Sequence, residues 1–322
     1  MGEWKDFLTE IKVNKDQKSK ILKGRNDSMD GKIKLQRIFG HIPDSIWPVS
    51  HGTKLDISER TQDKVSEDHK NDTLKIFDNS TRNKNVRWKG ALSIFPITIL
   101  NQLLDFYTEK GDTFFDPFAG HNSRMEASFK KGRHYIGYDI SHEFMNFNRD
   151  LAKVLLKNNP EKLNITLKEQ DSRTIDDPDN SVDFIFSSPP YWSLEWYGDE
   201  PEQLGKLSYE DFMKGMTDVY KQCYRVLKPG KFCIMNVNDF RLNGKYYSYH
   251  TDTINAMKEA GFTQYDLVIM KYGNSMRKCF PNQILSEKLM PKTHEFILVF
   301  YKAPEYEHSA VYPFKEKSKV KK

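Results

Sequence analysis

The chain has 322 residues and a formal net charge of +5 at pH 7. This length holds one large α/β domain with added segments, or two small domains, and it can bury a core without disulfides or metals. The mildly basic charge is compatible with a nucleic-acid partner but does not require one. The sequence has no apolar run of about 18 residues and no apolar N-terminal core. We therefore expect no membrane-spanning helix and no export signal.

Cysteine usage indicates a reducing compartment. The chain has three cysteines, Cys223, Cys233 and Cys279, and their spacing fits neither a disulfide framework nor a metal site. We therefore expect a cytoplasmic protein without a bound metal. Cys223 and Cys233 fall in a predicted helix and a predicted strand, which favours buried structural thiols over nucleophiles.

The two ends of the chain differ in composition from the middle. Residues 1–85 are rich in Lys, Asp, Asn and Ser and have few periodic apolar residues, which predicts a polar N-terminal segment. Within it, residues 42–48 are more apolar and are expected to pack on the main domain. Residues 303–322 form a basic tail, for which the composition predicts disorder.

From residue 86 onward the pattern alternates between strands and helices. Apolar residues at three- and four-residue steps predict helices, and short apolar runs that end at turn residues predict strands. We expect helices at 97–107, 122–131, 142–158, 209–227 and 250–260, and strands at 113–117, 134–138, 164–168, 182–187, 231–236, 265–271 and 295–301. This alternation predicts an α/β fold in which a largely parallel sheet is covered by helices on both faces.

A turn with nucleotide-binding character follows the first of these strands. The strand at 113–117 runs into Asp116-Pro117-Phe118-Ala119-Gly120, a helix follows, and the next strand ends at Asp139. In such units, backbone N–H groups of the turn approach a ligand, and the acid at the end of the second strand binds a ribose hydroxyl pair. The sequence thus predicts a nucleotide-like ligand here.

A second loop, Ser188-Pro189-Pro190-Tyr191, ends the apolar strand at 182–187. Its two prolines cannot donate to a sheet ladder, so they stop the strand and leave an extended loop at the edge where ligands bind. A hydroxyl, open carbonyls and one aromatic ring suit a planar base with an exocyclic amine. A proline-terminated strand with a surface tyrosine is the alternative interpretation.

Together, the two loops resemble those of the amino-directed DNA methyltransferases that use S-adenosylmethionine, over residues 86–302. The resemblance implies a Rossmann-like methyltransferase fold, with a mostly parallel seven-stranded sheet, helices on both faces and an antiparallel last strand. It also implies S-adenosylmethionine as the cofactor, with Asp171 near its adenine and Phe95 near its adenosine. The expected cofactor-binding residues are Phe95, Asp116, Pro117, Phe118, Ala119, Gly120, Asp139 and Asp171.

One position departs from the family's pattern. Where the family has Phe-x-Gly-x-Gly, often followed by two threonines, this chain continues after Gly120 with His121-Asn122-Ser123-Arg124. Asn tolerates left-handed backbone better than most residues, so we expect Asn122 to preserve the turn. His121 and Arg124 are expected to line the rim of the donor site.

The 188–191 loop is then the expected catalytic loop, with residues Ser188, Pro189, Pro190 and Tyr191. Hydrogen bonds from the target amine to Ser188 and to the Pro189 carbonyl would aim its lone pair at the methyl group. The base must be flipped out of the duplex, and Tyr191 is expected to stack on it. Serine at the first position favours N4 of cytosine. The alternatives are N6 of adenine, an RNA N-methyltransferase, and a non-catalytic DNA-binding relative.

The resemblance implies double-stranded DNA as the partner of a prokaryotic or phage-encoded enzyme, and it makes a cognate restriction nuclease a candidate second partner. The two loops are too close in sequence to enclose a recognition domain. Target recognition is therefore expected from residues 1–85, 192–207, 240–249 or 273–292. The last of these mixes basic and aromatic residues, which suits DNA contact.

Overall fold

The computed structural model describes residues 33–40, 43–49, 95–120, 122–157, 159–194, 200–272 and 281–304. The chain divides into two compact units, Met1–Asp44 and Ser45–Lys322. In the first unit, residues 33–39 form a helix. The second unit contains the predicted α/β fold. Of the basic tail, only residues 303 and 304 belong to the described part of the chain.

The centre of the second unit is an eight-stranded sheet with the order β1-β9-β10-β6-β5-β2-β3-β4. The five strands from β6 to β4 are parallel, and β10 is antiparallel to both of its neighbours. The parallel core and the antiparallel last strand confirm the expected methyltransferase-type sheet. The strands are β1 (Ile46–Val49), β2 (Thr113–Asp116), β3 (His134–Asp139), β4 (Ile165–Glu169), β5 (Val182–Ser187), β6 (Leu227–Val237), β9 (Thr263–Tyr272) and β10 (His294–Tyr301).

The sheet has eight strands, one more than the seven expected, because β1 adds to its edge. This short strand pairs in parallel with β9, from Ile46 opposite Ile269 to Val49 opposite Tyr272. Edge strands leave unpaired backbone groups that another segment can cover, and an edge is where a proline such as Pro48 is tolerated. Trp47, on the same strand, is only 7% exposed. Residues 46–48 thus pack on the main domain, as expected from their apolar character.

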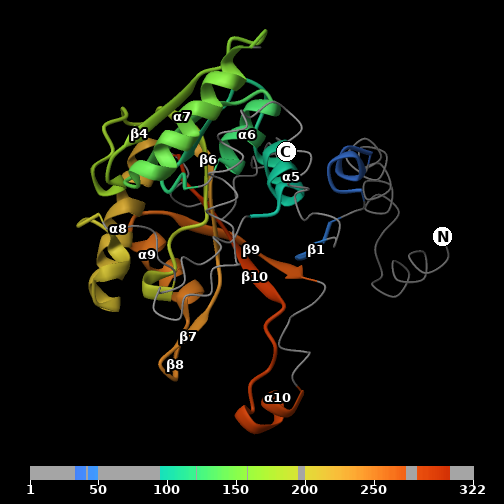
Figure 1. Ribbon diagram of the computed structural model, residues 1–322. Coiled ribbons are helices and arrows are strands. Elements are labelled where there is room, and N and C mark those ends of the chain that lie inside the picture. Colours follow the sequence, from blue (N-terminus) through green and yellow to red (C-terminus); the bar gives the residue numbers. More distant parts are fainter. Residues whose placement is uncertain are drawn as a thin grey trace, which may run out of the picture. The chain divides into compact units, whose positions relative to one another are not determined.

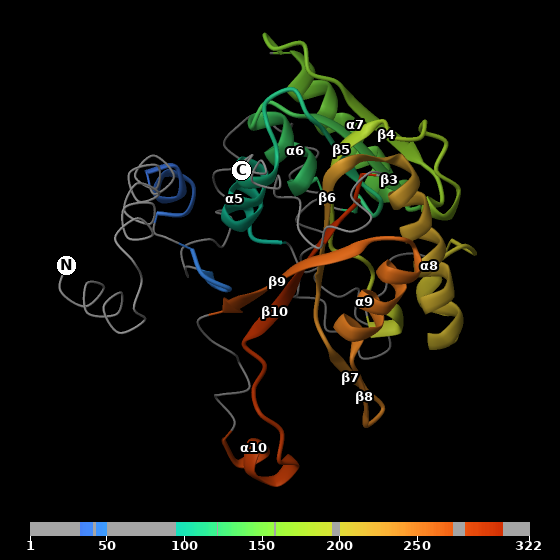
Figure 2. The same ribbon diagram turned by 180° about the vertical axis from the view of Figure 1, so that it is seen from behind.

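Helices cover both faces of the sheet, as Figures 1 and 2 show. On one face, Tyr107 at the end of α5 packs on Phe184 of β5. On the other face, α8 and α9 share a core with Ile185 of β5. None of the described helices is long and apolar enough to cross a bilayer. The helices are α5 (Ile97–Tyr107), α6 (Ser123–Lys130), α7 (His142–Lys157), α8 (Tyr209–Val226), α9 (Tyr249–Glu259) and α10 (Pro281–Glu287).

A small hairpin stands outside the main sheet. It consists of β7 (Phe240–Leu242) and β8 (Lys245–Tyr247), which pair with each other in an antiparallel sheet of their own. The two residues of its turn, Asn243 and Gly244, both have positive φ angles, of 49° and 78°. That combination is the one a tight two-residue hairpin turn requires. Beyond the sheet, α10 lies in the connection between β9 and β10, away from the other helices (Figures 1 and 2).

Gly137 allows the loop after β2 to lie close to β3. A Cβ atom at this position would lie 2.6 Å from the Tyr135 ring and 3.0 Å from Cβ of Ala119. We therefore expect Gly137→Ala to lower the free energy of unfolding by about 1–3 kcal/mol, since the fully buried Tyr135 ring has to move. Urea unfolding measures this change. A variant as stable as the parent would show that the ring can move without strain.

Candidate active site

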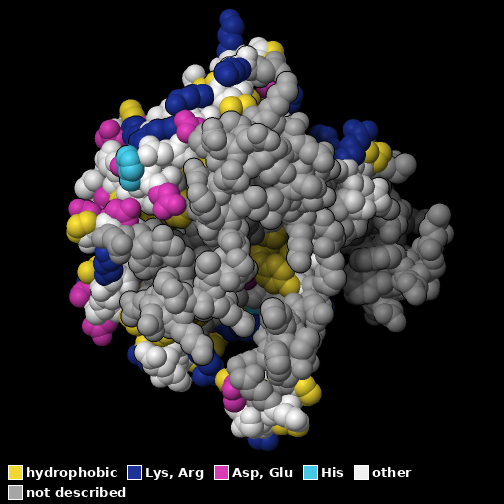
Figure 3. All heavy atoms as spheres, in the orientation of Figure 1, with side chains coloured by type: hydrophobic (Ala, Val, Ile, Leu, Met, Phe, Trp, Pro, Cys, Tyr) yellow, Lys and Arg dark blue, Asp and Glu magenta, His cyan; other side chains and the backbone are white. Residues whose placement is uncertain are grey.

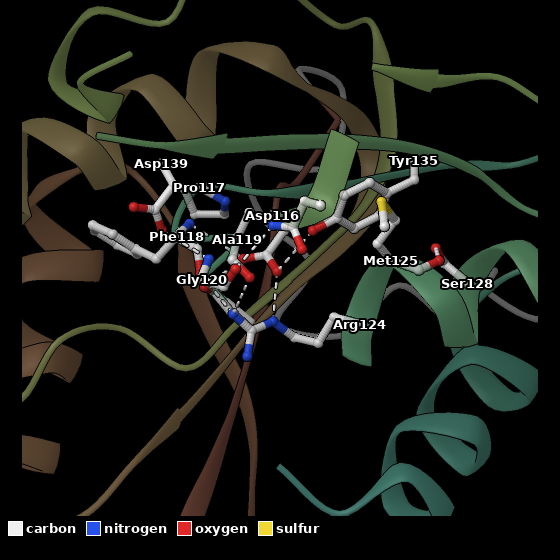
Figure 4. Close-up of polar contacts among 12 residues, drawn as sticks. Asp116, Pro117, Phe118, Ala119, Gly120, Arg124, Met125, Ser128, Tyr135 and Asp139 are labelled. Carbon is white, nitrogen blue, oxygen red and sulfur yellow. Dashed lines mark hydrogen bonds and ion pairs between the residues drawn. The ribbon is translucent and has the colours of Figure 1, made fainter. Parts of the chain in front are cut away.

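The loop after β2 is organised around the carboxylate of Asp116, which is 0% exposed. One carboxylate oxygen, Oδ1, accepts hydrogen bonds from the Phe118 N–H (3.2 Å) and from Oγ of Ser187 at the end of β5 (2.7 Å). The other, Oδ2, accepts from Nε of Arg124 (2.5 Å) and from the Tyr135 hydroxyl (3.3 Å). Figure 4 shows this carboxylate at the centre of the cluster. Asp116 therefore acts as a buried anchor that joins the ends of β2 and β5.

Arg124 is the counter-charge of Asp116, and its position corrects an expectation. Its side chain is 8% exposed, so it lies inside the site rather than at the rim. Nη2 of its guanidinium donates to the carbonyls of Phe118 (2.6 Å) and Ala119 (3.2 Å). Burial opposes the charge, but the carboxylate of Asp116 outweighs it, and the pKa of Arg124 is raised. The residue therefore stays charged and clamps the 116–120 loop. His121 lies outside the described residues.

Gly120 and Asp139 meet at the carboxyl ends of β2 and β3. Gly120 has a positive φ of 43°, and its N–H donates to Oδ2 of Asp139 at 2.7 Å. Its carbonyl accepts from the side-chain amide of Asn148 on α7 (2.9 Å), and the Ser141 N–H donates to Oδ1 of Asp139 (2.9 Å). Burial raises the pKa of Asp139 to about 6. Within the described ranges, Asp139 forms no ion pair, whereas Asp116 pairs with Arg124 at 2.5 Å.

Asn122 does not play the role expected from the sequence. Its φ is −55°, so it is a right-handed residue at the start of α6, and left-handed tolerance is not what the turn uses. Its side chain is buried, and its amide oxygen has no hydrogen-bond partner among the described residues. The same holds for the amide oxygen of Asn148. Two acceptors near Gly120 thus lack donors, which is a feature that a ligand with N–H or O–H groups can satisfy.

Asp171 lies after β4, at the start of the short turn η2 (Ser172–Thr174). Its carboxylate accepts from the backbone N–H of Arg173 (2.8 Å) and forms an ion pair with the guanidinium of the same residue (2.5 Å). The hydroxyl of Ser172 donates to the Pro117 carbonyl at 2.5 Å. The structure thus ties Asp171 to the 116–120 loop through the neighbouring serine.

Phe95 precedes α5 and is buried, with its ring centroid 4.7 Å from that of Phe186 on β5. Pro117 and Ala119 are buried as well, whereas Phe118 is partly exposed. Phe95 therefore packs on the sheet near the end of β5.

The 188–191 loop is fastened at both ends. The residue before it, Ser187, is held by Asp116. At its far end, the Pro190 carbonyl accepts a hydrogen bond from the Tyr249 hydroxyl at 3.0 Å, and the Tyr191 ring meets the Tyr249 ring edge-on at 5.9 Å. Between these anchors, Ser188 is partly exposed, and its hydroxyl makes no hydrogen bond within the described ranges. The loop is therefore rigid at its ends and open at its first residue.

Trp192 directly follows the 188–191 loop and connects it to neighbouring elements. Its indole N–H donates to the Leu207 carbonyl at 2.8 Å, and its ring lies 5.3 Å from Tyr209 and 5.2 Å from Tyr247. These contacts give Trp192 a packing role. Trp196 lies outside the described residues.

Sequence reasoning missed several residues that shape this site. Ser187, Asn148 and Tyr249 were not singled out, and each contacts the 116–120 or the 188–191 loop from a distant element. The one available signal was the position of Ser187 at the end of a buried strand, directly before the 188–191 loop. Cys223 and Cys233 are buried, and burial raises the pKa of both thiols, so they are not nucleophiles. Cys279 lies outside the part that the structure describes.

Comparison with known proteins identifies a matching protein family and several relatives. A family model described as DNA methylase, N6_N4_Mtase, matches residues 4–150 and 182–322. The chain is similar to the type II methyltransferase M.BglII of Bacillus subtilis, with 30% identity over 41% of this chain and 33% of that protein. It is also similar to the type II methyltransferase M.MthZI of Methanothermobacter thermautotrophicus, with 26% identity over 49% of this chain and 36% of that protein. The chain thus spans about a third of the length of these relatives.

Among solved structures, the chain is similar to a SAM-dependent methyltransferase from Methanosarcina mazei. The TM-score is 0.42 with 16% identity, over 66% of this chain and 100% of that one. The family match extends over most of the chain and includes both the 116–120 loop and the 188–191 loop. The chain therefore belongs to the DNA methylase family N6_N4_Mtase.

Proposed function

We propose that the protein is a site-specific DNA methyltransferase that moves a methyl group from S-adenosylmethionine to an exocyclic amino group of a flipped base. The observation that carries the proposal is the hydrogen bond of 2.7 Å between Ser187 and Asp116. It fixes the loop expected to hold the donor against the loop expected to hold the base. Methyl transfer needs the two reactants held in line, so a rigid connection between their binding loops serves the reaction directly.

S-adenosylmethionine is the methyl donor that membership in this family implies. The residues at Gly120 fit such a group, because the Asp139 carboxyl accepts only backbone N–H groups there and two nearby amide oxygens lack donors in the described chain. Asp139 would hold the ribose hydroxyls. When bound, the donor supplies an electrophilic methyl group on a sulfonium. The orphan acceptors thus support the donor site.

The 188–191 loop would orient the target amine. The Pro190 carbonyl is already bonded to Tyr249, which leaves the Ser188 hydroxyl and the Pro189 carbonyl as the acceptors for the amine protons. Two such hydrogen bonds favour a pyramidal nitrogen whose lone pair faces the methyl group. Tyr191 would stack on the base, and its edge-on contact with Tyr249 holds the ring in place.

The target base is proposed to be cytosine, methylated at N4, with N6 of adenine as the alternative. Support for cytosine comes from Ser188, because the resemblance to the methyltransferase family associates serine at the first position of this loop with N4 of cytosine. The known relatives are named type II methyltransferases without a target base. A cognate restriction nuclease is a proposed partner on the same grounds. Since the substrate would be cellular DNA, we also propose a cytoplasmic location.

The β7–β8 hairpin is the proposed DNA contact beside the catalytic loop. Tyr247 of the hairpin packs on Trp192, and Arg241 and Lys245 are exposed. The hairpin carries no acidic residue. Its base is fixed by Asp239, which accepts from the Tyr246 hydroxyl at 2.7 Å. Two rigidly presented cations suit contacts to DNA phosphates.

The hairpin belongs to the expected recognition segment 240–249. Three other expected recognition regions are only partly described. Residues 1–32, 41–42, 50–85, 195–199 and 273–280 lie outside the described ranges, so the recognition role of residues 1–85, 192–207 and 273–292 stays a proposal.

The first prediction from the proposed function concerns the catalytic loop. Tyr191→Ala removes a stacking surface worth about 1–3 kcal/mol per base, and Ser188→Ala removes one acceptor for the amine. Both variants should lose methylation much more than they lose melting temperature or donor affinity. Mass spectrometry of nucleosides from plasmid DNA measures the product.

The modified nucleoside also decides the target. N4-methylcytosine supports the proposed base, and N6-methyladenine supports the alternative. Methylated RNA with unmodified DNA would contradict the DNA assignment. Full activity in both variants would mean that the 188–191 loop only terminates a strand.

The second prediction concerns pH. Burial raises the pKa of Asp139 to about 6 in the protein without donor, and ribose hydroxyls would donate to the ionised carboxylate. Donor binding should therefore release a proton at low pH, and affinity should fall about tenfold per unit below pH 6 and level off above pH 7. Calorimetric titration across this range tests it.

Asp139→Asn is the matched control, because it keeps the size of the side chain and removes its titration. This variant should bind the donor more weakly by about 1–3 kcal/mol and should show no such pH dependence. Titration of the donor itself would appear equally in both proteins. A parent whose pH profile is as flat as that of the variant would rule out Asp139 as the ribose acceptor.

The third prediction concerns the hairpin. Arg241→Gln with Lys245→Gln should reduce the slope of log affinity for DNA against log salt by about 2, since each lost phosphate contact contributes about 0.9. Fluorescence anisotropy with duplex DNA measures the slope.

Lys153→Gln with Lys157→Gln on α7 is the matched control. These lysines are also exposed, and in both ribbon views α7 lies at the opposite end of the fold from the hairpin. Figure 3 shows Lys and Arg side chains over this part of the surface. An equal loss of slope in the two double variants would contradict a specific role for the hairpin.

A further inference from the structure

Arg124 has donors that the protein does not use. A guanidinium carries five N–H groups, and those of Nε and Nη2 are directed at Asp116 and at the carbonyls of Phe118 and Ala119. The remaining nitrogen, Nη1, makes no hydrogen bond to any described residue. In Figure 4 this nitrogen points away from the 116–120 loop, without a dashed line. Since the side chain is only 8% exposed, an acceptor for these two N–H groups is expected from a ligand.

The surroundings of Nη1 favour an anionic ligand. Arg124 is in the first turn of α6, where the backbone N–H groups give a helix its positive end. The residue before this helix, Asn122, makes no capping hydrogen bond to those groups with its side chain. A guanidinium binds a carboxylate more strongly than it binds a neutral acceptor. A carboxylate is therefore the group that this position suits.

Gly120 lies between this cation and the acid proposed to bind ribose. A Cβ atom on Gly120 would lie 3.9 Å from Nη2 of Arg124 and 3.9 Å from Oδ2 of Asp139. The site thus presents an acceptor of hydroxyl protons on one side of the glycine and a donor of N–H groups on the other. S-adenosylmethionine has a ribose diol at its centre and an amino-acid carboxylate at one end. The order of the two protein groups matches the order of these two ligand groups.

We propose that Nη1 of Arg124 binds the carboxylate of the methionine part of S-adenosylmethionine. The inference rests on the proposed function, since it needs the donor at this loop. Arg124 then has two tasks: it holds the loop through Asp116 and recognises the amino-acid end of the donor. Its position is one where the family often has threonine, so the contact belongs to this chain's own variant of the motif.

The test compares two ligands by calorimetry, S-adenosylmethionine and its decarboxylated form, which differ only in the carboxylate. The parent should bind the carboxylated ligand at least about tenfold more tightly. In Arg124→Met and Arg124→Gln, which both remove the charge, this ratio should fall to about threefold or less. Damage to the loop from loss of the Asp116 contact would weaken both ligands together and leave the ratio unchanged, so the ratio isolates the direct contact. Two variants are used so that failure of one to fold leaves the other.

Arg149→Gln is the control, because Arg149 is an arginine on α7 that pairs with Glu169 at 2.9 Å. It should keep the ratio of the parent. A parent that binds both ligands equally would overturn the inference and leave the proposed function standing. A folded Arg124 variant that keeps the parent's ratio would also overturn it. A parent that binds neither ligand would instead refute the proposed function.

Discussion

The site depends on one buried charge, the carboxylate of Asp116. It is 0% exposed and accepts hydrogen bonds from β5, β3 and α6, as well as from its own loop. An isolated carboxylate would be too costly to bury, and Arg124 supplies the opposite charge at 2.5 Å. Because its partners come from separate elements, their relative positions are set by the geometry of one group. The 116–120 and 188–191 loops are therefore placed together rather than separately.

Such a pair is a weak source of stability but a strong constraint on geometry. The desolvation of two charges offsets most of their attraction, so apolar residues in their place would often be as stable. What apolar residues could not do is bond to the Ser187 hydroxyl and to the backbone of Phe118 and Ala119. We interpret the pair as a device that specifies loop position, since methyl transfer requires the reacting groups to be held in line.

The sequence predicted the elements well because their signals are local. Alternation and turn residues located β5 at 182–187 without error, and the two motifs identified the loops at its end and at the end of β2. The remainder depended on contacts between distant segments. β1 is four residues long, contains Pro48, and pairs with a strand more than 200 residues away, so no local pattern marks it. Tyr249 reaches Pro190 across 59 residues for the same reason. Arg124 was placed at the rim because a charged residue beside a ligand loop is usually solvated.

The two acids of the site have the same local context and different tasks. Asp116 and Asp139 each end a parallel strand, β2 and β3 are neighbours, and the sequence predicts both acids as cofactor-binding residues. The difference comes from what lies beside them: Asp116 has the guanidinium of Arg124 and a full set of donors, whereas among the described residues Asp139 accepts only from the N–H groups of Gly120 and Ser141. Burial raises the pKa of Asp139 to about 6, against the lowering effect of these N–H groups and of the Arg124 guanidinium. A carboxyl in that state gains most when further donors arrive, and it is therefore the acid suited to a ligand, while Asp116 is the acid suited to the fold.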